Sequence, residues 1–265
     1  MRITVLGKSP AWQDADGACS GYLVEAGGTV VLLDCGPGVF AKLRRFVDYL
    51  EVDAVVISHL HADHILDLVT FASGLRYSPR QQPVPVAGYP GTDEPARPRL
   101  FAPPGAFEAF TALSAAGSMT PDHIELAFEV SVYDPASVLE LGGLSVRFQP
   151  VPHFIPANAV EIAADGARFT FSADCGPNEE LSAFARHTDL LMIEATLPRP
   201  ERDGVRGHLT PGEAGECGAA AGARRLVLTH FSDELDVESA VAEAARSFGG
   251  PVDAAHEGAV YELGE

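Results

Sequence analysis

The 265-residue chain carries 37 acidic against 18 basic residues, and this formal net charge of −19 disfavours a large nucleic acid as a partner because it repels polyphosphates. Hydrophobic residues make up 46% of the chain, enough for a sizeable core, but no apolar stretch is long enough to cross a bilayer. The four cysteines form no C-x-x-C pair and the N-terminal segment lacks the long apolar run of a signal peptide, so we expect a cytoplasmic protein with reduced thiols.

Short apolar runs that end in glycine turns alternate with helical patterns, which is typical of a layered α/β protein. In chain order, the predicted strands are Ile3–Leu6, Tyr22–Glu25, Val30–Leu33, Ala54–Ile57, Ser145–Phe148, Phe169–Ser172, Leu190–Ile193 and Leu226–Thr229. The predicted helices are Val39–Leu50, His64–Leu75, Ala106–Ala115, Leu181–Arg186, Pro211–Ala221 and Val237–Phe248. Residues 77–104 are rich in proline and predict a surface loop with one short strand near Val84–Val86, so we treat residues 1–265 as one domain.

Two predicted strands end in the same short sequence. Asp34-Cys35-Gly36-Pro37 follows one of them, and Asp174-Cys175-Gly176-Pro177 follows the other. This local repeat predicts two similar αβ halves that face each other.

The segment His59-Leu60-His61-Ala62-Asp63-His64 directly follows the predicted strand Ala54–Ile57. Alternate residues of an extended segment point the same way, so His59 and His61 can contact one metal ion. Asp63 and His64 start the next predicted helix and can turn toward a second ion. Imidazole and carboxylate ligands suit zinc, with Mn²⁺ or Fe²⁺ as substitutes. The segment therefore predicts a site for two zinc ions.

Six residues cannot fill two sites, so further ligands must come from elsewhere in the chain. His153, Asp174 and His230 each follow a predicted strand, and active sites of α/β sheets gather at the C-terminal ends of strands. His123, His187 and His256 have no such context, and we expect them to be structural or exposed.

The order of these residues along the chain, starting at Asp34, resembles that of the metallo-β-lactamase superfamily. The resemblance implies an αββα four-layer sandwich with a dinuclear site at one edge of its two sheets. The ligands that it implies are His59, His61 and His153 for one zinc ion, Asp63, His64 and His230 for the other, and Asp174 as the bridge. It also implies that Asp34 steadies a ligand from behind.

Two further segments, Ile193-Glu194-Ala195-Thr196 and Gly207-His208-Leu209-Thr210, resemble the phosphodiesterase branch typified by ribonuclease Z. In that branch a glutamate and an additional histidine flank the scissile phosphate. The resemblance thus makes His208 the proton donor to the leaving oxygen, with Glu194 orienting it. We count both, together with Asp63, as catalytic residues.

Members that mature tRNA carry a long arm between the third metal histidine and the bridging aspartate, whereas here only residues 154–173 lie between His153 and Asp174. The chain therefore resembles the short bacterial phosphodiesterases that act on cyclic nucleotides. We expect a dinuclear zinc phosphodiesterase that hydrolyses a small phosphodiester, a 3′,5′-cyclic nucleotide first, with Arg76 or Arg80 contacting its phosphate or ribose.

Two other activities stay open, namely a lactonase or ester hydrolase on the same metals and a tRNA 3′-processing endonuclease. The complete ligand set disfavours a non-catalytic binding module. The expected partner is a small molecule and not a membrane, and the sequence leaves a homodimer open.

Overall fold

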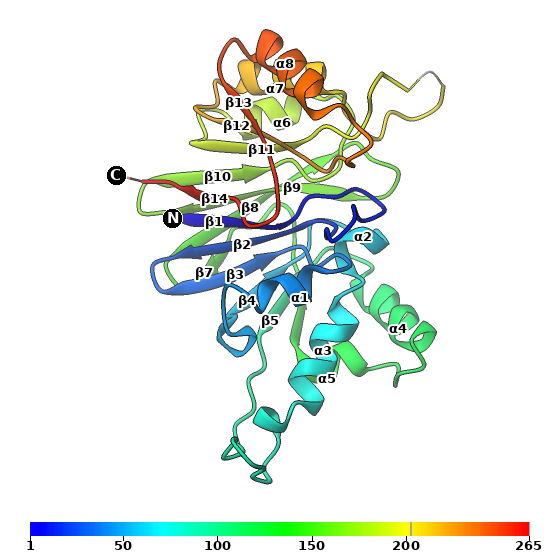
Figure 1. The fold of residues 1–265 in the computed structure, drawn as a ribbon, viewed down its shortest axis with the longest axis vertical. Coiled ribbons are helices and arrows are strands. Elements are labelled where there is room, and N and C mark those ends of the chain that lie inside the picture. The colour runs from blue at the N-terminus through cyan, green and yellow to red at the C-terminus, as the bar shows by residue number, and fades with distance from the viewer. Residues whose placement is uncertain (202, 265) are drawn as a thin grey trace.

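Two seven-stranded sheets face each other, and helices cover the outer face of each, in a computed structural model that describes residues 1–201 and 203–264 (Figure 1). The first sheet contains, in spatial order, β14 (Val260–Glu262), β1 (Arg2–Gly7), β2 (Gly21–Ala26), β3 (Thr29–Leu33), β4 (Ala54–Val56), β5 (Arg99–Ala102) and β6 (Glu129–Val132). The second contains β13 (Val252–Ala254), β12 (Leu226–Thr229), β11 (Leu190–Glu194), β10 (Ala167–Phe171), β9 (Ala157–Ala164), β8 (Leu144–Val151) and β7 (Leu139–Leu141).

The helices divide between the two outer faces according to their position in the chain. The first sheet is covered by α1 (Val39–Leu43), α2 (Ala62–Ile65), α3 (Leu68–Tyr77), α4 (Ala106–Ala116) and α5 (His123–Ala127). The second is covered by α6 (Glu179–Phe184), α7 (Pro211–Ala221) and α8 (Val237–Phe248). Two short 3-10 helices, η1 (Tyr49–Glu51) and η2 (Pro79–Gln81), lie in the connections. None of the described helices is long and apolar enough to span a membrane.

Alternation along the strands builds three apolar layers. In β3, Val31 and Leu33 belong to the core between the sheets, whereas Leu32 belongs to the core under α1 to α5. In β11, Met192 faces the other sheet and Ile193 faces α6 to α8. Each sheet therefore buries both faces, and the predicted αββα four-layer sandwich is confirmed.

Several predicted elements have different boundaries from those observed. The helix predicted at Val39–Leu50 ends at Leu43, because the chain turns there to bury Tyr49, and the Asp48 side chain accepts a hydrogen bond from the backbone N–H of Leu50. The helix predicted at His64–Leu75 is two helices, α2 and α3, separated at Leu66 and Asp67.

The proline-rich segment also differs from the prediction. Instead of a strand at Val84–Val86 it has a tight turn, in which Val86 and Tyr89 exchange backbone hydrogen bonds of 3.0 and 2.9 Å. Its C-terminal part forms β5, which is an interior strand of the first sheet. The strands β6, β7, β9, β13 and β14 were not predicted either. Of these, β9 is buried along nearly its whole length and therefore lacks the alternation that marks a strand.

Parallel pairing sets the position of the functional site. The run β3-β4-β5-β6 is parallel, and so is the run β10-β11-β12-β13. Consequently β3 and β4 of one sheet, and β10, β11 and β12 of the other, each end at one common edge of their sheet.

Candidate metal centre

Two clusters of metal-ligating side chains lie at the edge where these strands end. In each cluster the ligand atoms lie within 4.8 Å of one another. The members are His59, His61, His153 and Asp174 in the first cluster, and Asp63, His64, Asp174 and His230 in the second. All seven residues that the sequence proposes as ligands are thus brought together, and Asp174 is common to both clusters.

Distances inside the clusters are short for groups of this chemistry. They are 3.0 Å between His153 Nε2 and His61 Nδ1, 3.1 Å between His230 Nε2 and Asp63 Oδ2, 3.4 Å between His64 Nε2 and Asp174 Oδ1, and 3.7 Å between His59 Nε2 and Asp174 Oδ2. Aligned nitrogen and carboxylate atoms at such distances converge on a common centre, as ligands of one ion do.

Three buried ligand atoms have no hydrogen-bond partner, namely His59 Nε2, His64 Nε2 and Asp174 Oδ1. A buried polar atom without a partner costs about 1–3 kcal/mol, so native proteins contain few of them. Here three such atoms point into the clusters, where a cation would satisfy them. The side chains therefore fit metal ions, and nitrogen and oxygen donors of this kind suit zinc.

Four of the histidines direct Nε2 into a cluster, and in each of them the other ring nitrogen, Nδ1, has a partner that fixes the ring. Nδ1 of His64 donates to Asp34 Oδ2 (2.7 Å) and Nδ1 of His153 donates to the carbonyl of Gly207 (2.8 Å). Nδ1 of His59 lies 3.1 Å from Ser58 Oγ, and Nδ1 of His230 lies 2.9 Å from Thr196 Oγ1. Partners at Nδ1 leave Nε2 of each ring free for a metal.

Asp34 occupies a strained position behind the second cluster. Its φ of 58° is in the left-handed region, which is sparsely populated by residues other than glycine, although Asp and Asn are enriched there. The carboxylate is fully buried and accepts hydrogen bonds from Ser58 N (2.7 Å), Ser58 Oγ (2.8 Å) and His64 Nδ1. Asp34 therefore orients a candidate ligand without belonging to either cluster.

Glu194 and His208 form a hydrogen-bonded pair beside the second cluster. Nδ1 of His208 donates to Glu194 Oε1 at 2.9 Å, and the pair forms a third cluster together with His230. Glu194 is fully buried at the end of β11, and its oxygens also accept from Cys175 N (2.9 Å), Leu209 N (3.1 Å) and Thr196 Oγ1 (2.8 Å). These contacts fix the carboxylate and, through it, the imidazole.

The electrostatics differ between three of the ligand histidines and His208. Burial lowers the pKa of His59, His61 and His153 and so favours the neutral imidazole that binds a metal. Burial also opposes the charge on His208, but its hydrogen bond to Glu194, with the negative charges of Glu194 and Asp174, raises the pKa to about 9. His208 therefore holds a proton readily.

A cavity of about 370 Å³ opens onto these residues. The residues that line it include His61, Asp63, Asp174, His208 and His230 from the clusters, together with Trp12 and Phe154. Its size is typical of a small-molecule site.

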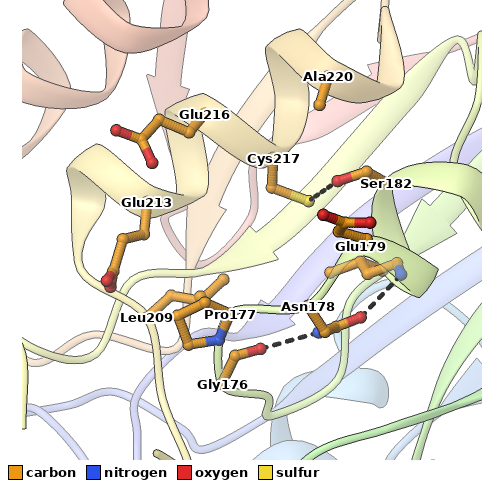
Figure 2. A pocket seen from close by; sticks show the side chains of 11 residues that line it. Gly176, Pro177, Asn178, Glu179, Ser182, Leu209, Glu213, Glu216, Cys217 and Ala220 are labelled. Carbon is orange, nitrogen blue, oxygen red and sulfur yellow. Dashed lines mark hydrogen bonds between the residues drawn. The ribbon is translucent and has the colours of Figure 1, made fainter.

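A second cavity of about 370 Å³ lies between α6 and α7 (Figure 2). Several of its polar side chains have partners in the fold. Asn178 Oδ1 accepts from Leu181 N (2.8 Å) to cap α6, Glu213 forms the capping box of α7 with Thr210, and Ser182 Oγ donates to Cys217 Sγ (3.3 Å). None of the proposed metal ligands lines this cavity, so we place the chemistry in the first one.

Arg76 and Arg80 are not brought to the site, contrary to the sequence prediction. Arg76 Nη1 bonds to His123 Nδ1 (2.8 Å), and Arg80 Nη1 donates to Asp48 Oδ1 (3.0 Å). Arg76 lies in the last turn of α3 and Arg80 in η2 just after it, so both side chains bind partners within the helical layer. His123, His187 and His256 were expected to be structural or exposed. His123 is buried and contacts Arg76, whereas His187 and His256 are exposed.

Sequence reasoning did not assign Ser58 and Thr196, which hold His59 and His230. Each lies beside a residue that it did single out, because Ser58 directly precedes His59 and Thr196 follows Glu194 by two positions. A hydroxyl residue near a proposed site residue is therefore a usable signal for such support.

Comparison with known proteins agrees with this geometry. Residues 29–231 match the family model described as beta-lactamase superfamily domain. An uncharacterized protein of Mycobacterium leprae is 32% identical over 99% of this chain and 89% of its own length. The ribonuclease Z of Myxococcus xanthus is 28% identical over 99% and 98% of the two chains.

A relative with a solved structure extends the comparison to the fold. The probable metallo-hydrolase YhfI of Bacillus subtilis is 29% identical over 99% of this chain and 100% of its own. Its crystal structure, as a metallo-beta-lactamase fold protein, superposes with a TM-score of 0.83 at 26% identity and covers 98% of this chain and 99% of YhfI. The chain therefore belongs to the beta-lactamase superfamily, and it is a metal-dependent hydrolase related to ribonuclease Z.

Proposed function

We propose that the chain is a dinuclear zinc phosphodiesterase that hydrolyses a small phosphodiester, with a 3′,5′-cyclic nucleotide as the first candidate. The observation that carries the proposal is the Glu194–His208 pair, which lies against the second metal cluster and in the wall of the same cavity. Two bound zinc ions supply positive charge to the phosphate and lower the pKa of the attacking water.

His208 supplies what the metal clusters alone do not, namely a proton for the leaving oxygen. The alkoxide that leaves a phosphodiester is a strong base and needs a proton as the bond breaks. Because Nδ1 of His208 is bound to Glu194, the proton for the substrate is held at Nε2. Glu194 keeps the ring oriented and stabilises its charged form, as a buried carboxylate does for a general acid.

Two properties support a small substrate over an RNA. The cavity volume of about 370 Å³ is in the range for small ligands. The net charge of −19 opposes long-range attraction of a polyanion. In this proposal, these two properties outweigh the name ribonuclease Z that several relatives carry.

The test compares two phosphodiesters that differ in leaving group. We expect His208→Ala to lower the rate on 3′,5′-cyclic AMP by about 10²–10⁴-fold, and to lower it much less on bis-p-nitrophenyl phosphate, whose nitrophenolate leaves without a proton. Metal content should stay at the parent level. The matched control is His187→Ala, which removes an exposed histidine and should change neither rate.

A substrate panel tests the choice of bond. It contains cyclic nucleotides, lactones and precursor tRNA, all measured with the zinc-loaded protein. Equal losses on both phosphodiesters in His208→Ala would reject His208 as the acid. A lactone or the precursor tRNA turned over faster than every cyclic nucleotide would reject the proposed substrate class.

A further inference from the structure

Two aromatic side chains on the wall of the active-site cavity take no part in the proposed chemistry. Trp12 is the only tryptophan of the chain, and its side chain is 52% exposed. Phe154 is 54% exposed. Both line the cavity that also contains His208 and His230. Exposed aromatic residues occur elsewhere on this surface, but these two are beside the reacting groups.

Phe154 is fixed by the histidines that surround it. It follows His153 directly, and its ring centroid lies 5.0 Å from that of His153 and 5.7 Å from that of His208. On another side it packs on Gly207, where a Cβ atom would lie only 2.4 Å from the phenylalanine ring. Glycine is therefore required at position 207 to admit the ring. The exposed part of Phe154 is thus presented from a fixed position next to the proposed proton donor.

Trp12 lies on a loop that a buried ion pair fastens to the metal centre. Lys8 and Asp14, on either side of it, form this pair, and their side chains are only 8% and 11% exposed. Lys8 Nζ also donates to the carbonyl of Phe231 (2.9 Å) and lies 4.3 Å from the centroid of that ring. Phe231 directly follows the candidate ligand His230.

Two further hydrogen bonds of Asp14 also hold the loop that carries Trp12. Asp14 Oδ1 accepts a hydrogen bond from Asp233 N (2.9 Å), and Asp14 N donates to Ser9 Oγ (3.1 Å). Charges are costly to bury unless they are paired and hydrogen-bonded, as they are here. The loop is therefore held in one position although Trp12, which it carries, is exposed. An exposed aromatic side chain on a fixed loop gives a largely preorganised binding surface.

We propose that Trp12 and Phe154 bind the nucleobase of the substrate by stacking, so that they select nucleotides among phosphodiesters. The inference rests on the proposed phosphodiesterase function and adds the part of the substrate that lies away from the phosphate. Every nucleobase has a flat π face, and aromatic side chains stack on it with little dependence on its identity. Recognition by stacking predicts a preference for nucleotides over base-free phosphodiesters and a weak preference among bases.

The first experiment uses Trp12 as its own reporter. The zinc-loaded protein is titrated with adenosine 5′-monophosphate, ribose 5-phosphate and inorganic phosphate, with excitation at the red edge of tryptophan absorption, where adenine does not absorb. We expect saturable quenching by adenosine 5′-monophosphate and none by the two base-free ligands. Equal responses to adenosine 5′-monophosphate and ribose 5-phosphate, or no response to either, would overturn the proposal.

The second experiment uses two esters with the same leaving group, thymidine 5′-(p-nitrophenyl phosphate) and methyl p-nitrophenyl phosphate. We expect Trp12→Leu and Phe154→Leu to lower kcat/KM for the nucleoside ester on the order of 5- to 100-fold, the usual contribution of one stacked base. The methyl ester should be nearly unaffected. Phe46→Leu, which removes an exposed aromatic ring outside the cavity, should leave both unchanged.

The results with the two esters distinguish a failure of the stacking proposal from a failure of the proposed function. Hydrolysis of the methyl ester by the parent protein tests phosphodiesterase activity without any base. If that activity is present and both variants lose equally on the two esters, the stacking proposal is wrong while the proposed function stands. If neither ester is hydrolysed, the proposed function fails, and the fluorescence titration still decides whether Trp12 meets a nucleobase.

Discussion

Replacement of Asp34 should weaken one metal site and leave the other nearly intact. Its carboxylate contacts His64, which belongs to the second cluster, and does not contact any ligand of the first. Loss of a carboxylate that orients a ligand histidine typically costs about 10–100-fold in metal affinity. We therefore expect Asp34→Asn and Asp34→Ala to lower the affinity for one of two zinc ions by that factor.

The two replacements should differ in their effect on stability. Asp34 accepts from three donors, of which the Ser58 hydroxyl can rotate away. Asp34→Ala leaves the other two, Ser58 N–H and His64 Nδ1–H, buried without an acceptor, at about 1–3 kcal/mol each, which gives a loss on the order of 2–6 kcal/mol. Asp34→Asn keeps one acceptor for Ser58 N–H and tolerates the φ of 58°, so its loss should be about half as large.

Zinc content at increasing concentrations of a competing chelator measures the affinities, and urea unfolding of the metal-free protein measures the stability. The metal-free state is used because bound zinc stabilises the fold by mass action and would mask the difference. Ser58→Ala is the counterpart on the other side, because its hydroxyl contacts His59 of the first cluster as well as Asp34. Equal weakening of both zinc sites in Asp34→Asn would refute the assignment of Asp34 to His64 alone.

Two further predictions concern Asp174, which belongs to both clusters, and Arg80, which lies away from them. Asp174→Ala removes the side chain common to both clusters, so elemental analysis should find both ions lost and almost no activity, with a larger effect than Asp34→Ala; retention of two ions per chain would contradict a shared ligand. Arg80→Ala breaks a half-exposed ion pair with Asp48 and should cost at most about 1 kcal/mol of stability in urea unfolding without changing kcat or KM on a cyclic nucleotide, whereas a raised KM would return Arg80 to the substrate site.

The sequence predicted the metal clusters better than it predicted the elements between them. His59 to His64 follow a buried strand directly, so the local spacing already places them, and strand-end context was sufficient for His153, Asp174 and His230. Strands that form only through pairing with distant segments could not be predicted in this way. β5 lies in a proline-rich segment and becomes an interior strand only because β4 and β6 lie on either side of it. Tertiary contacts of that sort leave no periodicity in a single sequence.

The arginines show the same limit at the level of side chains. Arg76 or Arg80 was expected to contact the phosphate or ribose of the substrate. Each has a partner far away in sequence, His123 for one and Asp48 for the other, and only the folded chain reveals these partners. Trp12 illustrates the same limit, since nothing in its sequence neighbourhood places it in one cavity with Phe154.

The repeated Asp-Cys-Gly-Pro sequence explains how one fold supplies two aspartates with different roles. β3 and β10 hold equivalent positions, because each pairs antiparallel with the strand before it and parallel with the strand after it. The following glycines also act alike. A Cβ atom at Gly36 would lie 1.9 Å from the carbonyl oxygen of Asp63, and one at Gly176 would lie 2.2 Å from that of Arg206. Each glycine therefore admits the close approach of a segment that carries site residues.

The aspartates of the two repeats differ because the chain turns at different positions. The left-handed residue of the first repeat is Asp34 itself (φ 58°), whereas that of the second is Ala173 (φ 52°), one position earlier. Asp34 consequently directs its carboxylate to Ser58 and His64 from behind, while the carboxylate of Asp174 reaches both clusters. Identical letters in the sequence predict that both strands deliver an acid to the same edge. The one-residue shift of the turn, which the sequence does not show, decides which acid supports a ligand and which can bind the metals.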